Sequence, residues 1–501
     1  MLSFDLGTSA LKVGLVSVDG DLLFSDEYPL VNHLGADGAS EQDPNEWWSL
    51  VSRGSGAVAS AGFDMSAVVA VAVTGQFSST VPVDANGKPT GPCIMWNDGR
   101  GSELTAALGA TDELEHHWYA VTGSPVPRGS GRAVNHLAFL ERGLPEIAVR
   151  TRWYLEPVDY LTMRLTGVVA ATRSSMCVVQ LFDIHDPERL DYDSQLVADL
   201  GIDPKKLPPL IPTCAVTGGV SERAARELGV PPGTPVVNGL PDNQAATLGS
   251  GAVNLWEAHF VISSTAWVST PLSEPLSDAA RAIGSVPSMW RGEYMLMTNQ
   301  DTAGTSLSWL RDLLAPLAGG SLTIDDLVAL AAESPPGAQG VLFAPWLCGE
   351  RTPAVDSSLR ASLTGIGVRT TLADLARAVL EGVAVNARWM LDEVEWVTRR
   401  RFEPIRFLGG GARSDLWAQI IADVFGRRIE RVAAPTHAGL RGAALYALVA
   451  MGHIDRSSLG ELVRVERVFT PDAALEQLYT ASAARLVSLY EATALRTREG
   501  R

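Results

Sequence analysis

The first thirty residues alternate strand-like runs with short polar turns, which restricts the chain to folds that begin with an antiparallel meander. The runs cover 2–6, 13–18 and 22–28, and the first alternates apolar and polar side chains as a strand does. Asp19-Gly20 separates the second run from the third, and this dipeptide is a strong hairpin signal. The stretch DLGTSALK (5–12) therefore falls in the turn between the first two strands.

Strand-like and helix-like segments alternate along the rest of the chain. Further strand-like runs cover 68–75, 79–84, 234–240, 259–270, 340–347 and 405–411. The clearest helical segment is 371–394, where apolar residues recur three and four positions apart and form one stripe. Thr371 and Asp374 predict a capping box at its start. The pattern indicates an α/β fold whose strands are buried on both faces.

Chain length favours two large domains, because 501 residues exceed the usual size of a single core. A strand–polar turn–strand unit occurs in each half, at 2–18 and at 258–270. The segment 228–243 is rich in Pro and Gly and is the predicted hinge. We therefore expect two related halves that close on a cleft.

Charge and composition exclude several classes of protein. A net charge of −17 argues against a nucleic-acid partner, since no broad basic face is available to neutralise phosphates. The longest apolar runs, 68–73 and 444–451, are too short to span a membrane. No leader pattern opens the sequence, and the scattered Cys93, Cys177, Cys214 and Cys348 match neither disulfide nor metal spacing. We expect a cytoplasmic protein. The adjacent His116-His117 pair is also not a metal pattern.

The turn at 5–12 has two readings on its residues alone. Gly7 permits close backbone approach, Thr8 and Ser9 offer hydroxyl and amide donors, and Lys12 offers a compact positive charge. Asp5, at the end of a strand, could hold a magnesium ion through water. These groups suit the phosphates of a nucleotide, although the motif is not a Walker P-loop. A plain surface hairpin is the alternative.

Three further stretches place polar groups after strand-like runs. In GLPDNQAATLG (239–249), Asp242 is either the N-cap of the following helix or a general base at the mouth of the cleft. In FLGGGARSDLWAQIIADVFG (407–426), glycines before a helix let a phosphate or flat ligand approach main-chain amides. In GERTP (349–353), Glu350 and Arg351 either pair with each other or brace the cleft.

Taken together and in order, these motifs resemble the FGGY family of carbohydrate kinases, and the xylulokinases within it. The resemblance spans some 440 residues. It rests on DLGTSALK (5–12), SEQDPNEWW (40–48), TGQFSSTVPVD (74–84), IMWNDGR (94–100), VDYLTMRLTG (158–167), GLPDNQAA (239–246), GERTP (349–353), LTGIGVRTTLADLARAVLEGVAV (363–385), LGGGARSDLWAQIIADVFG (408–426) and AGLRGAALYA (438–447). It favours the phosphate-binding reading of the first turn.

The resemblance implies an actin-like ATPase fold, with two ribonuclease H-like domains flanking a deep cleft. Residues 1–244 would form the N-terminal, sugar-binding domain and residues 245–501 the C-terminal, ATP-binding domain. Asp242 would be the catalytic base, and Asp5 and Asp242 would hold Mg²⁺. The nucleotide would contact Thr8, Ser9, Lys12, Ser264, Thr265, Gly304, Gly410, Gly411 and Ser414. The sugar would face Gln76, Phe77, Ser78, Trp96, Asp98 and Asn243.

Three positions depart from the family pattern. Gln76-Phe77-Ser78 stands where xylulokinases usually have Gln-Met-His, which predicts a reshaped sugar pocket. Ser263-Ser264-Thr265-Ala266 stands where the family has Gly-Thr-Ser-Gly, and Ala266 would be strained if the turn needed a positive φ. Pro241 replaces a residue that is commonly small and stiffens the loop before Asp242.

The expected function is ATP-dependent phosphorylation of a small sugar hydroxyl, in a ketopentose such as xylulose. Alternatives within the enzyme class are kinases of ribulose, a tetrulose, a pentitol or a glycerol-like polyol. A non-catalytic actin-like ATPase switch is the alternative from another class, and it would leave WNDGR (96–100) unexplained. Dimers are common among relatives, so the resemblance suggests a homodimer, with no nucleic-acid or membrane partner.

Overall fold

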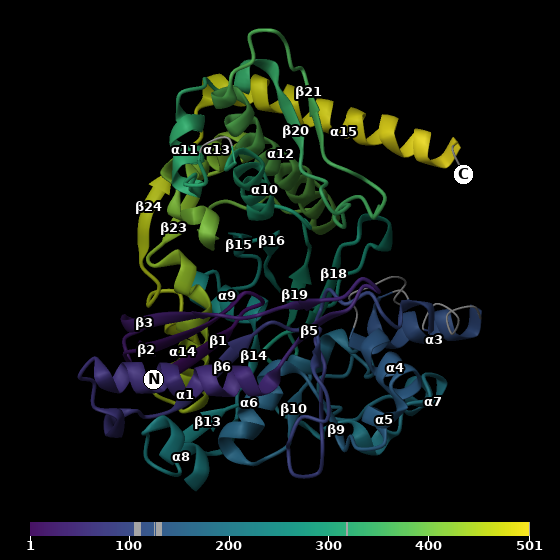
Figure 1. The fold of residues 1–501 in the computed structure, drawn as a ribbon, viewed down its shortest axis with the longest axis vertical. Coiled ribbons are helices and arrows are strands. Elements are labelled where there is room, and N and C mark those ends of the chain that lie inside the picture. The colour runs from purple at the N-terminus through teal and green to yellow at the C-terminus, as the bar shows by residue number, and fades with distance from the viewer. Residues whose placement is uncertain (105–111, 125, 127–132, 317–318, 500–501) are drawn as a thin grey trace.

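The computed structural model describes residues 1–104, 112–124, 126, 133–316 and 319–499, and it is built around two main sheets, one from each half of the chain (Figure 1). Across the N-terminal sheet the strands are β12 (Val216–Gly219), β13 (Pro235–Val237), β6 (Val71–Gly75), β1 (Leu2–Leu6), β2 (Ala10–Val16) and β3 (Leu22–Pro29), and β14 (Leu240–Pro241) also pairs with β6. The predicted meander is present, since β1, β2 and β3 pair antiparallel in sequence.

Two helices cover opposite faces of this sheet. Val13 and Gly14 are neighbours on β2, so their side-chain positions point to opposite faces. Val13 contacts Gly54 of α1 (Pro44–Ser60), whereas a Cβ on Gly14 would meet Leu440 of α14 (Ala438–Ala450) at 2.9 Å. The strands are therefore buried on both sides, as the sequence predicts.

The C-terminal sheet repeats the opening of the N-terminal one. Its strands, in order, are β16 (Ala266–Ser269), β15 (Ala258–Ile262), β22 (Ile405–Leu408), β23 (Ile429–Val432) and β24 (Val465–Phe469). In both sheets a first strand forms an antiparallel hairpin with the next strand and pairs in parallel with a later one, β6 in one case and β22 in the other. Beside it lies a smaller sheet of β17 (Pro271–Leu272), β19 (Tyr294–Met297) and β18 (Gly284–Pro287).

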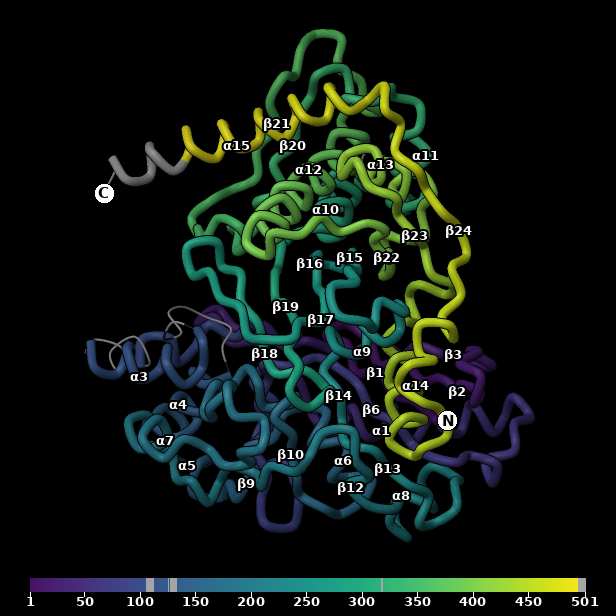
Figure 2. The backbone as a smooth tube through the Cα atoms, turned by 180° about the vertical axis from the view of Figure 1, so that it is seen from behind, coloured from purple at the N-terminus to yellow at the C-terminus, as the bar shows by residue number. Residues whose placement is uncertain are grey.

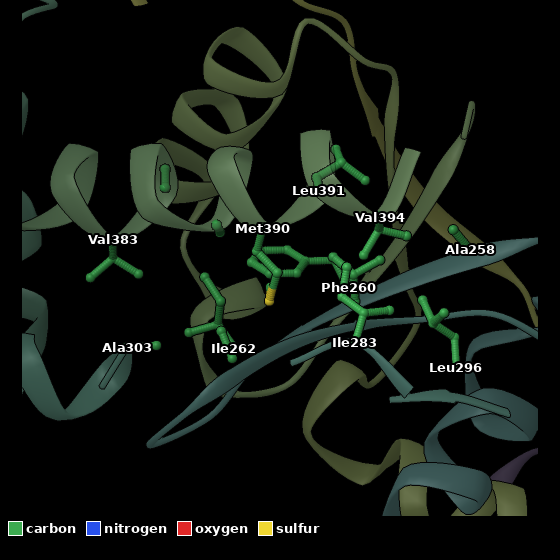
Figure 3. Packing of buried hydrophobic residues seen from close by; sticks show 14 of the residues in the cluster. Ala258, Phe260, Ile262, Ile283, Leu296, Ala303, Val383, Met390, Leu391 and Val394 are labelled. Carbon is green, nitrogen blue, oxygen red and sulfur yellow. The ribbon is translucent and has the colours of Figure 1, made fainter. Parts of the chain in front are cut away.

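The main core of the C-terminal half lies between β15 and α12 (Leu372–Thr398). Thr371 and Asp374 form the predicted capping box, each side chain accepting a hydrogen bond from the other's main-chain N–H. Figure 3 shows Met390 and Val394 of α12 projecting toward Phe260 on β15. The Phe260 ring also lies 5.7 Å from the ring of Phe407 on β22. The packing of α12 on β15 holds this strand in place, and the candidate site residues Ser264 and Thr265 follow soon after its end.

Helices α9 (Asp242–Ser250) and α14 pack together so closely that their backbones touch. A Cβ on Gly249 would overlap the carbonyl oxygen of Ala438, and one on Gly442 would overlap that of Ala245. Although α14 is near the end of the sequence, it lies among the N-terminal strands in both views (Figures 1 and 2). The C-terminal part of the chain thus completes the N-terminal layer.

Other elements surround this framework. Among the described residues, the remaining α-helices are α3 (Asp112–Thr122), α4 (Ala133–Gly143), α5 (Pro145–Ala148), α6 (Pro157–Thr166), α7 (Ser194–Asp199), α8 (Glu222–Leu228), α10 (Gly304–Leu314), α11 (Ile324–Ala332), α13 (Asp415–Phe425) and α15 (Glu476–Glu499). Short strands are β4 (His33–Leu34), β5 (Ser40–Gln42), β7 (Val81–Val83), β8 (Cys93–Ile94), β9 (Trp153–Leu155), β10 (Ala171–Thr172), β11 (Leu210–Ile211), β20 (Leu342–Ala344) and β21 (Ser362–Thr364).

The segment 228–243, which the sequence suggests as a hinge, is built into the N-terminal sheet. It supplies β13 and β14, and both pair in parallel with β6. Its last residues begin α9, so the segment leads directly from the sheet into the helix between the two halves. Within the described ranges, no helix has the length and apolar character needed to cross a membrane.

Candidate active site

Three neighbouring parallel strands end at the same edge of the N-terminal sheet. Leu6 of β1 and Pro241 of β14 both lie opposite Gly75 of β6. The residues that follow these strands are Gly7 to Ser9, Gln76 to Ser78 and Asp242, which the sequence analysis selected separately. Because ligands of α/β sheets bind at the carboxyl ends of strands, this edge is the natural place for a site.

Asp5 precedes the end of β1 and lies against the start of α14. A Cβ on Gly439 would stand 2.5 Å from Asp5 Oδ2, so the carboxylate fits here only because residue 439 has no side chain. Burial raises the pKa of Asp5, while the positive charges of Lys12 and His437 oppose that rise. The carboxylate is therefore desolvated and lies near Lys12 of one half and His437 of the other, whose own pKa burial lowers.

Asp242 is the first residue of α9, and Pro241 is the N-cap, so Asp242 does not cap the helix as one reading of the sequence expected. Burial, and then the nearby negative charge of Asp5, raise the pKa of Asp242 to about 7. A main-chain hydrogen bond from Asn243 and the charge of Lys12 oppose the rise. A carboxylate with this pKa is partly deprotonated near neutral pH and can accept a proton.

The pair of carboxylates fits a divalent cation. Asp5 and Asp242 are close enough for the charge of Asp5 to raise the pKa of Asp242. The positive charge of Lys12 acts on both carboxyl groups and lowers the pKa of each. Mg²⁺ prefers hard oxygen donors and is usually bound by one or two carboxylates, with water completing the coordination shell. The donor set is thus chemically suited to magnesium.

A partly buried hydrogen-bond network holds the turn after β1. Trp96 Nε1 donates to Thr8 Oγ1 at 2.9 Å, and Gln42 Nε2 donates to the main-chain oxygen of Thr8 at 2.7 Å. Gln76 Nε2 in turn donates to Gln42 Oε1 at 3.3 Å. The side chain of Ser9 remains exposed. The network fixes Thr8 while leaving the neighbouring hydroxyl open to a ligand.

Sequence reasoning missed Gln42, the centre of this network. Gln42 is fully buried, and its Oε1 also accepts from Trp47 Nε1 at 3.0 Å. Both residues lie within SEQDPNEWW (40–48), a motif that contributed to the resemblance without a role assigned to any residue. The motif at 40–48 pointed to this region, but the hydrogen bonds of Gln42 to Thr8 and Gln76 are visible only in the fold.

The loop after β6 has an unusual backbone. Ser78 has a φ of 61°, in the left-handed region. The next residue, Ser79, donates its main-chain N–H to Glu156 Oε2 at 3.3 Å. Glu156 is 2% exposed, and burial raises the pKa of its carboxyl well above the usual value. Glu156, which sequence reasoning also missed, therefore anchors the loop that the resemblance assigns to the sugar.

Asn243 and Asp98 differ in what they can offer a ligand. Asn243 is 5% exposed, its Nδ2 donates only to Met297 Sδ at 3.0 Å, and its Oδ1 has no partner among the described residues. A hydroxyl donor would satisfy that oxygen. Asp98 is fully buried and accepts hydrogen bonds from Ser40 N and Arg100. This placement makes Asp98 a support for the site, not a group open to the sugar.

In the C-terminal sheet the hairpin turn 263–265 occupies the place that Gly7 to Ser9 occupies in the N-terminal one. Ser264 is exposed and Thr265 half-buried. The expected strain at Ala266 is absent, because Ala266 begins β16 opposite Ile262 and has no positive φ. Gly304 donates its N–H to Ser263 O at 2.9 Å, and a Cβ there would overlap that oxygen.

The glycine turn follows β22, the parallel neighbour of β15. Gly409 has a φ of 90°, which favours glycine. Gly410 is exposed, whereas Gly411 packs against Ile262, where a Cβ would come within 2.6 Å of Ile262 Cγ2. Ser414 Oγ accepts from Trp417 N at 3.1 Å and caps α13. The turn thus offers a bare backbone before a helix N-terminus, which suits phosphate or a nucleoside.

Lys12 connects the two edges. Its Nζ donates to the main-chain oxygen of Thr436 at 3.2 Å. The preceding residue, Pro435, accepts from Gly409 N at 3.0 Å. The hairpin after β1 and the glycine turn after β22 therefore share one short segment, 435–437, and the predicted nucleotide residues lie on both sides of it.

The side chains of Glu350 and Arg351 do not pair with each other, although the main-chain N–H of Arg351 donates to Glu350 Oε1 at 2.9 Å. Arg351 forms an ion pair with Asp301, with 3.0 Å between nitrogen and oxygen. Glu350 Oε1 accepts the main-chain N–H of Asp301 at 3.1 Å, and Glu350 Oε2 accepts Asn386 Nδ2 at 2.8 Å. Burial raises the pKa of Glu350 to about 8. The group braces the loop that leads to Gly304.

Histidine and cysteine do not form a further site. His116 and His117 are on α3, and His117 Nε2 lies 3.2 Å from Asp193 Oδ1. The four cysteines are free. Within the part of the chain that the structure describes, no cluster of three or more His, Cys, Asp or Glu side chains could hold a metal.

In comparisons with known proteins, both halves of the chain match the same family. The N-terminal domain of the FGGY family of carbohydrate kinases matches residues 1–249, and the C-terminal domain of that family matches residues 245–451. The chain is 29% identical to a xylulose kinase of Staphylococcus epidermidis over 509 aligned residues, which cover 100% of this chain and 97% of the relative. A gluconokinase of Bacillus subtilis is 26% identical and covers 91% of this chain and 88% of its own length.

A solved structure has the same fold over the whole length. The xylulose kinase from Rhodospirillum rubrum superposes with a TM-score of 0.85 at 26% identity, covering 100% of this chain and 99% of that one. Sequence and fold therefore agree from end to end with one family.

Proposed function

This chain belongs to the FGGY family of carbohydrate kinases, and we propose that the sugar it phosphorylates is the ketopentose xylulose, with Asp242 as the catalytic base. The fold is the actin-like ATPase fold with two domains, and ATP is the phosphoryl donor of the family. The observation that carries the proposal is the position of Asp242, a desolvated carboxylate at the strand edge beside Asp5, with a pKa of about 7.

In the proposed reaction, a sugar hydroxyl attacks the γ-phosphorus of ATP. The new oxygen–phosphorus bond forms as the bond to the β,γ-bridging oxygen breaks, and ADP leaves. Asp242 takes the proton of the attacking hydroxyl, which becomes more acidic as it bonds to phosphorus. Such general base catalysis contributes ~10²–10⁴ in rate, while positioning and charge neutralisation supply most of the remainder.

The nucleotide and its metal would use groups from both sheets. Thr8, Ser9 and Lys12 would face the transferring phosphates, and Ser264, Thr265 and Gly304 would line the opposite turn. Gly410, Gly411 and Ser414 would border the adenosine. Asp5 and Asp242 would hold Mg²⁺, which when bound neutralises charge on the phosphates. Lys12 supplies a second positive charge at the same place.

The sugar would lie beside Gln76, Phe77, Ser78 and Asn243, with Trp96 holding Thr8 nearby. The unpartnered Oδ1 of Asn243 supports this placement, because a sugar hydroxyl can donate to it. Xylulose is favoured since a relative whose alignment covers the whole chain is a xylulose kinase. Because Ser78 stands where xylulokinases usually have histidine, ribulose, tetruloses, pentitols, glycerol and gluconate are the alternative substrates.

The experiment is a coupled ADP-release assay with Mg·ATP and a panel of these sugars and polyols. A sugar-dependent rate with xylulose, at half-saturation below 1 mM on the ~1 μM–1 mM scale usual for enzymes, would support the proposal. A larger kcat/KM for another member of the panel would replace xylulose by that substrate. ATP hydrolysis that no sugar accelerates would favour the ATPase switch.

The proposal also includes the cellular location and the oligomeric state of the protein. Four free cysteines and a reaction that consumes ATP favour the reducing cytoplasm as its location. The resemblance favours a homodimer, which light scattering on the purified chain would test. A monomeric mass at micromolar concentration would contradict it.

A further inference from the structure

The side chain of Gln244 joins the catalytic helix to both halves of the chain. Gln244 lies in the first turn of α9, two residues after Asp242, and is fully buried. Its Oε1 accepts a hydrogen bond from Ser174 Oγ at 2.9 Å. Its Nε2 donates to the main-chain oxygen of Pro287 at 3.0 Å. One amide group thus has two partners that lie outside the helix.

These partners come from different parts of the fold. Ser174 follows β10, in the N-terminal half, and immediately precedes the short 3-10 turn 175–178. Pro287 is the last residue of β18, in the small sheet of the C-terminal half. Asp242 itself follows β14 of the N-terminal sheet. The first turn of α9 is therefore the point where three segments meet.

On one side this junction borders a cavity. A cavity of about 410 Å³ opens beside it, and Pro287 and Arg173, the neighbour of Ser174, both line that cavity. Helix α9 is held by backbone contact with α14 at Ala245 and at Gly249. In its first turn, Asn243 Nδ2 donates to Met297 Sδ, and the two hydrogen bonds of Gln244 add links to Ser174 and Pro287.

Glutamine is the side chain that this junction requires. A carboxamide has an acceptor at one end and donors at the other, and here each end has its complementary partner. Methionine would keep a similar shape and make neither bond. Glutamate could accept from Ser174 but could not donate to Pro287 while ionised. The chemistry of position 244 is therefore matched to a bridge between a hydroxyl and a carbonyl.

We propose that Gln244 is a positioning residue for phosphoryl transfer, whose amide holds the first turn of α9, and with it the carboxylate of Asp242, in place relative to both halves. The inference rests on the proposed role of Asp242. A displacement of about 1 Å in a catalytic group can cost ~10²-fold in rate, so two neutral hydrogen bonds can matter far more to turnover than to stability.

The test compares four single variants of the full-length protein and the double variant of Gln244→Met with Ser174→Ala. Gln244→Met removes both bonds, and Ser174→Ala removes one. Thr247→Val is the matched control on the same helix, because Thr247 is fully buried and its hydroxyl bonds only to Asn243 O, within α9. Ser175→Ala is the control for the loop, because Ser175 Oγ bonds to Thr172 and to the buried Asp159 rather than to Gln244.

We expect Gln244→Met to lower kcat about 10- to 100-fold, with KM for sugar and ATP changed less than about threefold. Ser174→Ala should lower kcat by a smaller factor, and should have no further effect in the Gln244→Met background. Both controls should keep the parental kcat. Equal losses of kcat in Gln244→Met and Thr247→Val, at equal losses of melting temperature, would overturn the proposal.

A second readout separates this inference from the proposed function. Hydrogen exchange of amides in 242–250 needs no turnover. Gln244→Met should speed exchange in the first turn at least tenfold more than Thr247→Val does. Unchanged exchange would overturn the positioning role even in an active kinase. Faster exchange in a protein that phosphorylates no sugar would uphold the bridge and reject the function instead.

Discussion

Gly439 lies directly against the carboxylate of Asp5, although 434 positions separate the two residues in sequence. A Cβ on Gly439 would stand 2.5 Å from Asp5 Oδ2 and 3.0 Å from Asp5 Cγ. The atoms that such a Cβ meets belong to a side chain, so Asp5 can move aside without disturbing the backbone. The start of α14 thus determines where a proposed metal ligand lies.

Gly439→Ala should therefore reduce activity far more than stability. We expect kcat/KM to fall about 10²-fold because Asp5 is displaced, while the free energy of unfolding changes by less than ~1 kcal/mol, since alanine favours a helix. Steady-state kinetics and urea unfolding measure the two effects.

Gly56→Ala is the matched control for this variant. Gly56 is also helical, in α1, and a Cβ there meets nothing within 4 Å. Its kcat/KM should equal that of the parent protein. Full activity of Gly439→Ala, or a loss shared by Gly56→Ala, would contradict the role given to Asp5.

Asp242→Asn should preserve the fold and ATP binding but lose sugar phosphorylation. Asparagine keeps the size of the side chain and cannot accept the proton, so kcat should fall ~10²–10⁴-fold. Rapid-quench measurement of sugar phosphate and calorimetric titration of ATP separate the two properties. Asp423→Asn is a control, because Asp423 is 7% exposed on α13 and bonds to Gln419 and Asp472. Parental turnover of Asp242→Asn would show that another group is the base.

The pH dependence of kcat/KM should report the raised pKa of Asp242. An acid must lose its proton to act as a base, so a folded-state pKa of about 7 makes the protein less active below pH 7. The rate should rise about tenfold per pH unit up to that value and then level off. Because the charge of Asp5 contributes to the raised pKa, residual activity of Asp5→Asn should level off at lower pH. A parental profile already flat at pH 5 would exclude this ionisation.

Local sequence patterns predicted the elements well, because their causes are local. Thr371 and Asp374 form their capping box as expected, and the hairpins at 2–16 and 258–269 are present. Some strand-like runs were predicted too long: the run 340–347 contains a strand only at Leu342–Ala344, although Pro345 and Trp346 are buried too. Hydropathy does not distinguish a buried loop from a buried strand.

Long-range relationships were not predictable in the same way. Nothing near residue 439 signals a contact with Asp5, and nothing near Gln42 signals Thr8. The guanidinium of Arg351 pairs with Asp301 instead of with the carboxylate of its neighbour Glu350, because the fold brings the 301 loop beside it. Motif order supplied the family, and with it the candidate site, but not the contacts that hold each side chain in place.

Ser78→His should change which sugar the protein prefers. Ser78 occupies the loop after β6 with a φ of 61°, and histidine is among the residues that tolerate this backbone region. A longer side chain with two ring nitrogens would extend from the loop that is proposed to face the sugar. We expect the ratio of kcat/KM between xylulose and the other sugars of the panel to change at least tenfold, or ~1.4 kcal/mol of transition-state discrimination. Ser60→His, on the exposed part of α1, should leave every ratio unchanged. If the two variants had the same substrate profile as the parent, the specificity of this protein would lie elsewhere than in the Gln76 to Ser78 loop.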